Sequence, residues 1–271
     1  MTELRLVFER DELPPLPLPA ELRRLYGGDL RLADETLFAN FVETVDGVVA
    51  IPSLERSNAL ISGSEADRFV MGLLRAAADV VLVGCGTVIA SPKGRWKAQT
   101  VFPPAADLYD ELRRSLGRDG DARVAIVTGR GSVDPGHPAV RDGALILTTA
   151  LGYERLAGRI EPPAELEVVA GESAVDVRAA TEALRARGHR RILSEAGPRL
   201  FASLTRERLV DDLFLTVSPL LAGRSAELEK LGLVHGVDLL PDQRVELRLD
   251  SVRVEGEHLF LRYRLASGAN A

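Results

Sequence analysis

Short apolar runs alternate along most of this chain with segments of helical periodicity, and this alternation restricts the fold more than any other feature. Apolar runs of this kind are typical of strands buried on both faces, as in parallel sheets covered by helices. The expected strands are residues 37–45, 79–87, 123–130, 144–149, 166–170, 190–195 and 211–221, and the expected helices are 64–78, 105–116, 175–188 and 198–208. We therefore predict an α/β fold with a mainly parallel central sheet flanked by helices.

The two ends of the chain have other patterns. Residues 245–254 and 257–265 alternate apolar and polar side chains around Glu255-Gly256, which predicts an antiparallel C-terminal hairpin with one face in water or under a partner. The four prolines of DELPPLPLP (11–19) exclude regular structure there. We expect an N-terminal extension at 1–35 that lies across the body, with a short helix at 20–26; a flexible tail is the alternative. One domain is expected at 36–266, followed by a tail at 267–271.

Composition excludes several classes of protein. A net charge of −6 without a dominant Lys/Arg cluster argues against nucleic acid as the main partner. A single cysteine, Cys85, excludes disulfides within the chain and a cysteine-rich zinc site, so we expect no metal. It also fits a reducing cytoplasm. No signal-peptide pattern opens the chain, and no uncharged apolar run approaches the ~20 residues of a membrane span, so no membrane partner is expected.

The segments that follow the buried strands are the candidate sites, because open α/β sheets bind ligands at the carboxyl ends of their strands. Three such segments stand out: Gly84-Cys85-Gly86-Thr87, Thr128-Gly129-Arg130 and Glu195-Ala196-Gly197-Pro198-Arg199.

The turn before the helix at 198–208 suits a pyrophosphate. Gly197 permits close backbone approach, and Pro198 fits the first helical position, where no N–H is needed. The unpaired N–H groups of the first turn and the helix dipole favour an anion, and Arg199 adds a charge. An ordinary strand–helix turn is the alternative.

The other two segments are ambiguous by themselves. The GCGT segment is neither a dinucleotide G-x-G-x-x-G fingerprint, since residue 89 is Ile, nor a Walker loop. Thr128, Gly129 and Arg130 can clamp a 2′-phosphate through hydroxyl, N–H and guanidinium, but a solvated loop arginine remains an alternative.

Taken in order, five segments resemble the pyrimidine reductase domain of riboflavin biosynthesis, and the resemblance spans residues 37–266. They are TVDGVVA (44–50), ALISGSEADRFVMGLLRAAADVVLVGCGTV (59–88), VAIVTGR (124–130), ILSEAGPRLFASL (192–204) and LVDDLFLTVSPLLAG (209–223). The resemblance implies a dihydrofolate-reductase-like fold, a homodimer and an NADPH-dependent oxidoreductase. That family reduces the ribosyl side chain of 5-amino-6-(5-phosphoribosylamino)uracil to ribityl. Hydride goes to the sugar carbon that carries the amine, so positioning does most of the work.

The resemblance also implies the roles of individual residues. The cofactor would contact Gly84, Gly86 and Thr87, the adenosine 2′-phosphate Thr128, Gly129 and Arg130, and the pyrophosphate the run Gly197, Pro198, Arg199, Leu200, Phe201, Ala202 and Ser203. Glu195 would face the substrate, with Asn58 and Arg75 as substrate and substrate-phosphate ligands, while Thr44 and Asp46 line the mouth where nicotinamide meets substrate. Glu195 and Asp46 are thus the candidate catalytic residues. A turn pair at Asp46, a solvated Arg75 and a capping Glu195 are the alternatives.

The match is weaker around the substrate. Ile89-Ala90-Ser91-Pro92-Lys93 replaces an acidic pair and proline, Leu60 replaces a tryptophan, and Arg95 is only loosely aligned with a phosphate-binding arginine. Two other functions therefore stay open: reduction of another substrate such as dihydrofolate or a pterin, and NADPH binding without turnover. The family's deaminase partner needs a His/Cys/Cys zinc site, which a single cysteine excludes.

Overall fold

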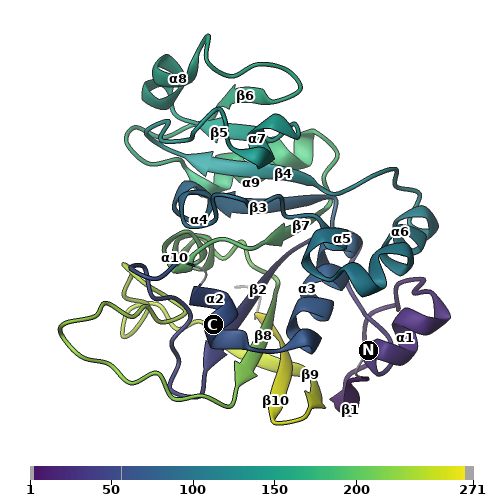
Figure 1. Cartoon of the computed structure of the whole chain (residues 1–271). Coiled ribbons are helices and arrows are strands. Elements are labelled where there is room, and N and C mark those ends of the chain that lie inside the picture. The colour runs from purple at the N-terminus through teal and green to yellow at the C-terminus, as the bar shows by residue number, and fades with distance from the viewer. Residues whose placement is uncertain (1–2, 56, 266–271) are drawn as a thin grey trace.

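The strands form one sheet in the computed structural model, which describes residues 3–55 and 57–265 (Figure 1). They are β1 (Arg5–Glu9), β2 (Thr36–Thr44), β3 (Val80–Gly84), β4 (Arg123–Thr128), β5 (Leu145–Thr148), β6 (Glu165–Val168), β7 (Arg191–Ser194), β8 (Asp212–Ser218), β9 (Leu247–Glu255) and β10 (His258–Leu265). Their order across the sheet is β1-β9-β10-β8-β2-β7-β3-β4-β5-β6.

The sheet is mainly parallel, as predicted. All neighbours from β8 to β6 run parallel, whereas β10 pairs antiparallel with β8 and with β9. The predicted α/β class and the C-terminal hairpin are therefore confirmed. The carboxyl ends of β2, β7, β3 and β4 consequently lie side by side at one edge of the sheet.

Helices cover both faces of the sheet. They are α1 (Ala20–Tyr26), α2 (Ser57–Ser62), α3 (Glu65–Ala77), α4 (Cys85–Ile89), α5 (Ala98–Val101), η1 (Pro103–Ala105), α6 (Ala106–Ser115), α7 (Pro138–Arg141), α8 (Ala150–Leu156), α9 (Val177–Ala186) and α10 (Pro198–Arg206). Alternate residues of each strand serve the two faces: Val81 and Val83 pack with α3 and α6, whereas Val80 and Leu82 pack with α9 and α10. This explains why the strand sequences are apolar throughout.

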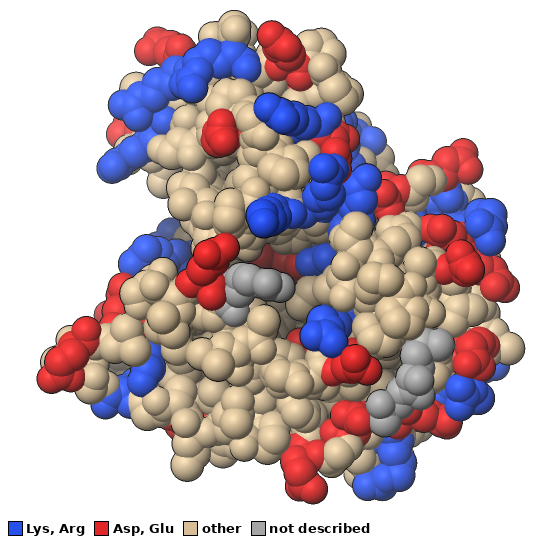
Figure 2. Space-filling view, viewed as in Figure 1, with Lys and Arg blue, Asp and Glu red and all other residues tan. Residues whose placement is uncertain are grey.

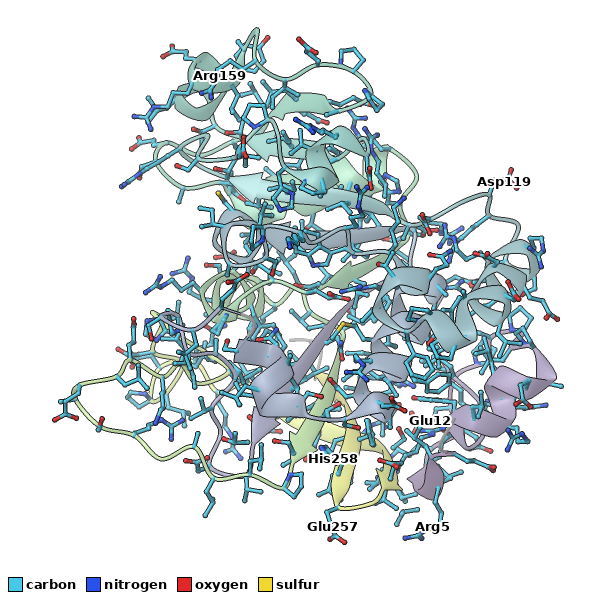
Figure 3. All side chains as sticks on the ribbon, in the orientation of Figure 1. Arg5, Glu12, Asp119, Arg159, Glu257 and His258 are labelled. Carbon is cyan, nitrogen blue, oxygen red and sulfur yellow. The ribbon has the colours of Figure 1, made fainter. Side chains whose placement is uncertain are left out.

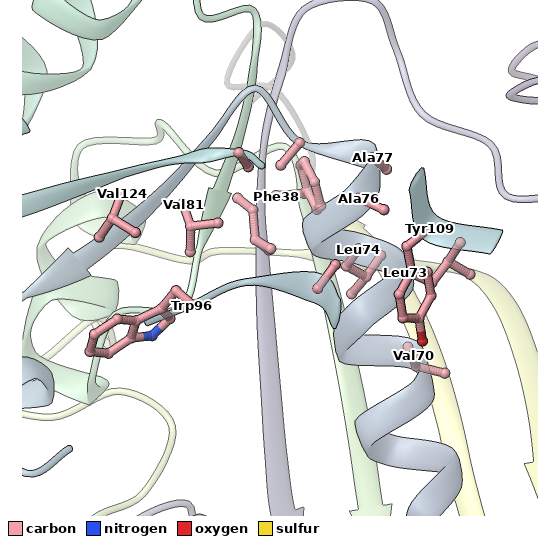
Figure 4. Packing of buried hydrophobic residues seen from close by; sticks show 14 of the residues in the cluster. Phe38, Val70, Leu73, Leu74, Ala76, Ala77, Val81, Trp96, Tyr109 and Val124 are labelled. Carbon is pink, nitrogen blue, oxygen red and sulfur yellow. The ribbon is translucent and has the colours of Figure 1, made fainter. Parts of the chain in front are cut away.

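The position of α3 is set by close packing (Figure 4). Leu73 and Leu74 are fully buried, each worth about 1.5–3 kcal/mol of burial free energy. A Cβ on Gly72 would lie 2.6 Å from the Tyr109 ring, so only glycine admits this ring against the helix. The hydroxyl of Tyr109 donates to the Phe69 carbonyl at 2.8 Å. These contacts fix the helix that carries Arg75.

The N-terminal extension packs against the sheet along its described part. β1 pairs antiparallel with β9, and Leu22 and Leu25 of α1 are fully buried. The buried Arg253 guanidinium lies 4.0 Å from the centre of the Tyr26 ring. The predicted helix at 20–26 is present, and the alternative of a flexible tail does not describe residues 3–35. The domain boundary at 35/36 stays a prediction, and the tail at 267–271 lies outside the described residues.

The short elements were missed from the sequence. The predicted strand at 79–87 ends at Gly84, where α4 begins, and β1, α2, α5, α7 and α8 were not predicted. These elements span one or two turns, or a single edge strand, so they offer too few residues for a periodicity to be recognised.

Candidate functional site

The three predicted segments that follow β3, β4 and β7 meet the end of β2 at the carboxyl edge of the sheet. Figure 2 shows that the molecule is hollowed at this level, between the part that contains β4–β6 and the part that contains β2, β8 and β10, with Lys and Arg side chains along the upper side. Within the described residues no group of His, Cys, Asp and Glu could hold a metal ion.

The start of α10 leaves main-chain donors without a side-chain cap. Gly197 is the N-cap residue and Pro198 the first helical residue. The N–H groups of Leu200 and Phe201 both bond to the Gly197 carbonyl at 3.1 Å, whereas no backbone carbonyl of the described residues accepts the Arg199 N–H. The Arg199 side chain is 71% exposed. This end is therefore suited to bind an anion through backbone and charge.

The remaining residues of the predicted pyrophosphate run differ in their surroundings. Phe201 is buried with its ring 4.8 Å from that of Phe41, and Ala202 is also buried. The side chains of Phe201 and Ala202 are therefore part of the core and are not available to a ligand. The Ser203 hydroxyl donates to the Arg199 carbonyl at 3.2 Å. Because Pro198, Phe201 and Ala202 are buried, only the side chains of Arg199, Leu200 and Ser203 are accessible to a ligand. That a ligand contacts them stays a prediction.

The start of α4 lies directly beside the start of α10. A Cβ on Gly197 would lie 3.3 Å from the Thr87 hydroxyl, and one on Gly84 would lie 3.5 Å from the Leu200 side chain. A Cβ on Gly86 would meet nothing within 4 Å. Glycines at these positions let two helix starts without side-chain caps lie close together, and the open space at Gly86 lets a phosphate group approach backbone N–H groups there.

Neighbouring segments fix the backbone of the Thr128-Gly129-Arg130 segment. The buried Thr128 hydroxyl accepts the Ser132 N–H at 3.2 Å, and a Cβ on Gly129 would collide with the Ser173 carbonyl. Arg155 donates to the Arg130 carbonyl at 3.1 Å. The Arg130 side chain is exposed and makes no ion pair with any described residue, so it is available to an anion at the end of β4.

Glu195 and Arg75 are bonded to each other. The Arg75 Nε and Nη2 atoms donate to the two Glu195 carboxylate oxygens at 2.7 and 2.6 Å. Both side chains are only 9% exposed. The alternatives of a solvated arginine and of a carboxylate that caps neighbouring N–H groups do not describe this arrangement.

Asp46 anchors a loop onto the end of β2. Its carboxylate accepts the Thr44 hydroxyl at 2.5 Å and the N–H groups of Ala222 and Gly223 at 3.0 and 2.7 Å. These bonds, led by that of Thr44, lower the pKa of Asp46 to about 2. The group is therefore ionised at neutral pH and is arranged to hold the loop. Its predicted place, with Thr44, at the mouth of the site stays a prediction.

The structure does not bring the other substrate candidates together. Arg95 is 45% exposed and lies 2.5 Å from Asp142, which comes just before β5 and thus at the opposite end of that strand. Asn58 is exposed on α2, whereas the neighbouring Ser57 is buried and accepts the Ile51 N–H at 3.3 Å. Their roles in substrate binding stay predictions.

Several buried acids were not singled out from the sequence, and Asp67 is one of them. Asp67 on α3 accepts the Ser62 hydroxyl at 2.7 Å, while its N–H donates to Ser64, the N-cap residue of that helix. Burial raises the pKa of Asp67. The S-x-x-D spacing of a capping box was the signal that could have identified it.

The fold and this edge define an α/β protein whose sheet is arranged to receive a nucleotide at its carboxyl end. The family model of the RibD C-terminal domain matches residues 35–261, so the chain belongs to that family. The resemblance to a riboflavin-pathway reductase domain is thereby confirmed. No helix in the described ranges is long and apolar enough to cross a membrane.

Relatives agree with this assignment, and solved structures share the fold. Two proteins named 2,5-diamino-6-ribosylamino-4(3H)-pyrimidinone 5′-phosphate reductase are similar: one from Archaeoglobus fulgidus at 28% identity over 69% of this chain and 81% of that protein, and one from Methanothermobacter thermautotrophicus at 29% over 83% and 95%. A pyrimidine reductase-like protein from Corynebacterium diphtheriae has the same fold, with a TM-score of 0.69, 22% identity and coverage of 90% of this chain and 98% of that chain. RibD from Acinetobacter baumannii has a TM-score of 0.64 at 17% identity, covering 86% and 58%.

Proposed function

We propose that this chain is an NADPH-dependent reductase of a phosphoribosylamino-pyrimidine, which converts the ribosyl side chain to ribityl in riboflavin biosynthesis. The observation that carries the proposal is the pair of uncapped helix starts, at Gly197 and Gly84, beside the buried carboxylate of Glu195. Membership of the RibD C-terminal domain family supports it.

The residues present fit the cofactor. The first turn of α10 would hold the pyrophosphate, Thr87 would contact the cofactor beside it, and Arg130 would bind the 2′-phosphate. NADPH, when bound, supplies the hydride that reduces the sugar carbon carrying the amine. The protein's part is to hold substrate and cofactor together, a contribution that can reach about 7–11 kcal/mol of the activation barrier. Glu195 would accept hydrogen bonds from the substrate.

The comparisons and the sequence resemblance point to two different pyrimidine bases in the substrate. The two curated relatives are named for a 2,5-diaminopyrimidinone, whereas the resemblance drawn from sequence implied the aminouracil. The two compounds carry the same phosphorylated sugar and differ in the base, so the reduction chemistry is common to both. We propose the phosphorylated ribosylamino-pyrimidine as the substrate class.

The test follows NADPH oxidation with each pyrimidine and with dihydrofolate. Turnover of either pyrimidine with little of dihydrofolate supports the proposal, and preference for dihydrofolate refutes it. In parallel, NADPH at about a hundredfold excess over Kd should stabilise the protein by about 2.7 kcal/mol. No stabilisation would remove cofactor binding altogether, and stabilisation without turnover would indicate a binding module.

We further propose a cytoplasmic homodimer whose reductase domain spans 36–266. Exposed apolar side chains on β9, β10 and β1, including Leu247 at 45%, Leu259 at 40% and Phe8 at 39%, support an association surface. Light scattering that gives the mass of one chain would refute the dimer.

A further inference from the structure

Trp96 has a backbone conformation that its residue type rarely adopts. Its φ angle is 51°, in the left-handed region, where a bulky side chain is crowded by its own backbone. Among the described residues other than glycine, only Trp96 and Arg208 have a positive φ angle. Arg208 follows the end of α10, whereas Trp96 lies in the irregular segment between α4 and α5. Such strain persists only where the surroundings impose it, and it is concentrated at functional sites.

The ring of Trp96 is held in the core. Trp96 is only 6% exposed and belongs to the apolar cluster that contains Val81 of β3 and Val124 of β4 (Figure 4). The centre of its ring lies 6.1 Å from that of the His137 ring, and a Cβ on Gly94 would lie 2.7 Å from its edge. The surroundings of the ring therefore determine where the strained backbone lies.

The segment 91–97 is bonded at both of its ends. The Nδ1 atom of His137 accepts a backbone N–H, so the Nε2 atom carries the proton and donates to the Ser91 carbonyl at 3.0 Å. At the other end, the Lys97 carbonyl accepts a bond from the Arg75 Nη1 atom at 3.2 Å. The segment thus connects the start of α7 with α3, and Trp96 lies directly before the carbonyl that contacts Arg75.

The Lys97 carbonyl fixes the Arg75 guanidinium and leaves it able to bind a further group. An arginine has five N–H donors, of which two bond to the Glu195 carboxylate and one to the Lys97 carbonyl. A fourth faces the Met71 sulfur, which is a weak acceptor. Acceptors on two sides of a planar guanidinium set its plane, and with it the direction of the donors that remain.

We propose that Trp96 is a positioning residue of the reductase. Its left-handed backbone turns the Lys97 carbonyl toward Arg75, and the burial of its ring offsets the strain of that backbone. Trp96 itself contacts neither substrate nor cofactor in this proposal, and it acts through Arg75, for which the family resemblance implies a bond to the substrate's phosphate. The inference rests on the proposed function.

The first experiment separates the backbone of Trp96 from its ring. Glycine adopts a φ of 51° without strain, whereas leucine does not, so Trp96→Gly keeps the path of the chain and Trp96→Leu loses it. We expect kcat/KM for the phosphorylated pyrimidine to fall about tenfold in Trp96→Leu and less than about threefold in Trp96→Gly, because a misplacement of ~1 Å can cost ~100-fold. Packing alone predicts the reverse order, since glycine removes more of the buried side chain. That order, or equal losses, would overturn the inference.

The matched control is Phe102→Leu. Phe102 is buried in the same cluster, but its ring packs on that of Phe69. It should keep kcat/KM within about twofold, and circular dichroism melting confirms that every variant is folded at the assay temperature. A loss in Phe102→Leu equal to that in Trp96→Leu would assign both losses to core packing and refute the inference.

The second experiment keeps Trp96 and moves its ring. Because a Cβ on Gly94 would lie 2.7 Å from the ring, Gly94→Ala displaces the ring without opening a cavity. Trp96 is the single tryptophan of the chain, so its fluorescence reports this displacement directly. We expect a shifted emission together with a lower kcat/KM for the phosphorylated pyrimidine. A shifted emission with unchanged kcat/KM, or a lower kcat/KM without a shift, would contradict the proposed role.

The same pyrimidine without its phosphate distinguishes the two possible failures. If Trp96 acts through Arg75, Trp96→Leu loses several-fold more kcat/KM on the phosphorylated compound than on the compound without phosphate. Equal losses on the two compounds, in a protein that is otherwise active, refute the inference alone. An unaltered protein that turns over neither pyrimidine refutes the proposed function, and the inference with it.

Discussion

The two halves of the candidate site use different chemical groups: one uses the backbone and the other uses charged side chains. The proposed cofactor half, at the ends of β7, β3 and β4, consists of glycines and uncapped backbone around Gly197, Gly84 and Gly86. The proposed substrate half, around β2 and α3, depends on charged side chains: Arg75 holds the Glu195 carboxylate, and the Asp46 carboxylate holds the backbone of the loop at Ala222. Backbone N–H groups suit a group that is the same in every ligand, such as a diphosphate. Side chains can be replaced during evolution, so a site made of side chains can adapt to a different substrate.

The largest effect is expected from Gly197→Val. The new side chain would meet the Thr87 hydroxyl and cover the first-turn N–H groups, so NADPH affinity should fall roughly 100-fold, the equivalent of about 2.7 kcal/mol. Calorimetry measures it. Gly232→Val is the matched control, because a Cβ there meets only atoms at 3.6 Å or beyond. If Gly197→Val and Gly232→Val bind NADPH with equal affinity, the assignment of the cofactor to the Gly197 half of the site is wrong.

Arg130→Ala should give the next largest effect. Loss of a charge-assisted bond to the 2′-phosphate costs about 1.5–3 kcal/mol, so NADPH should bind roughly 10- to 100-fold more weakly while NADH is unaffected. The control is Arg159→Ala, at the outer end of the molecule beyond α8 (Figure 3). Equal losses for the two cofactors would contradict the proposed 2′-phosphate site.

Asp46→Asn tests the substrate half. An amide in place of the carboxylate weakens the bonds to Ala222 and Gly223 and frees the loop, so kcat/KM for the pyrimidine should fall about tenfold with NADPH affinity kept within about twofold. Steady-state kinetics and calorimetry provide the two numbers. Asp242→Asn, on an exposed part of the following loop, is the control. If Asp46→Asn instead weakens NADPH binding, the proposed separation of the cofactor half from the substrate half is wrong.

The smallest effect concerns Asp67 and pH. Because its folded-state pKa is raised, the folded protein keeps a proton that the unfolded chain loses above about pH 4. The free energy of unfolding therefore falls as pH rises from about 4 through the raised pKa. Asp67→Asn should lack this part of the slope in a Tm series, whereas Asp119→Asn at an exposed loop (Figure 3) should keep it. Parallel curves for the unaltered protein and Asp67→Asn would contradict the assignment.

The contrast between the halves also explains what the sequence could predict. Apolar runs and the Gly-Pro turn at 197–198 are local signals, so the parallel strands, the long helices and the α10 start were predictable. The ion pair of Arg75 with Glu195 joins residues 120 positions apart, and the Asp46 anchor spans 176. The first pair depends on β7 lying between β2 and β3, and the second depends on β8 lying beside β2, and no local pattern records this strand order. The sequence thus predicted the main strands and helices on which these residues lie, and it missed the partners that bond to their side chains.

The three residues from Glu195 to Gly197 have an evolutionary consequence. They join a carboxylate of the substrate half to the helix cap of the cofactor half, so a replacement that moves either end moves both. Selection for a new substrate cannot easily act on this tripeptide without disturbing the coenzyme. Divergence among such reductases should accumulate instead in segments outside this tripeptide, such as 89–100.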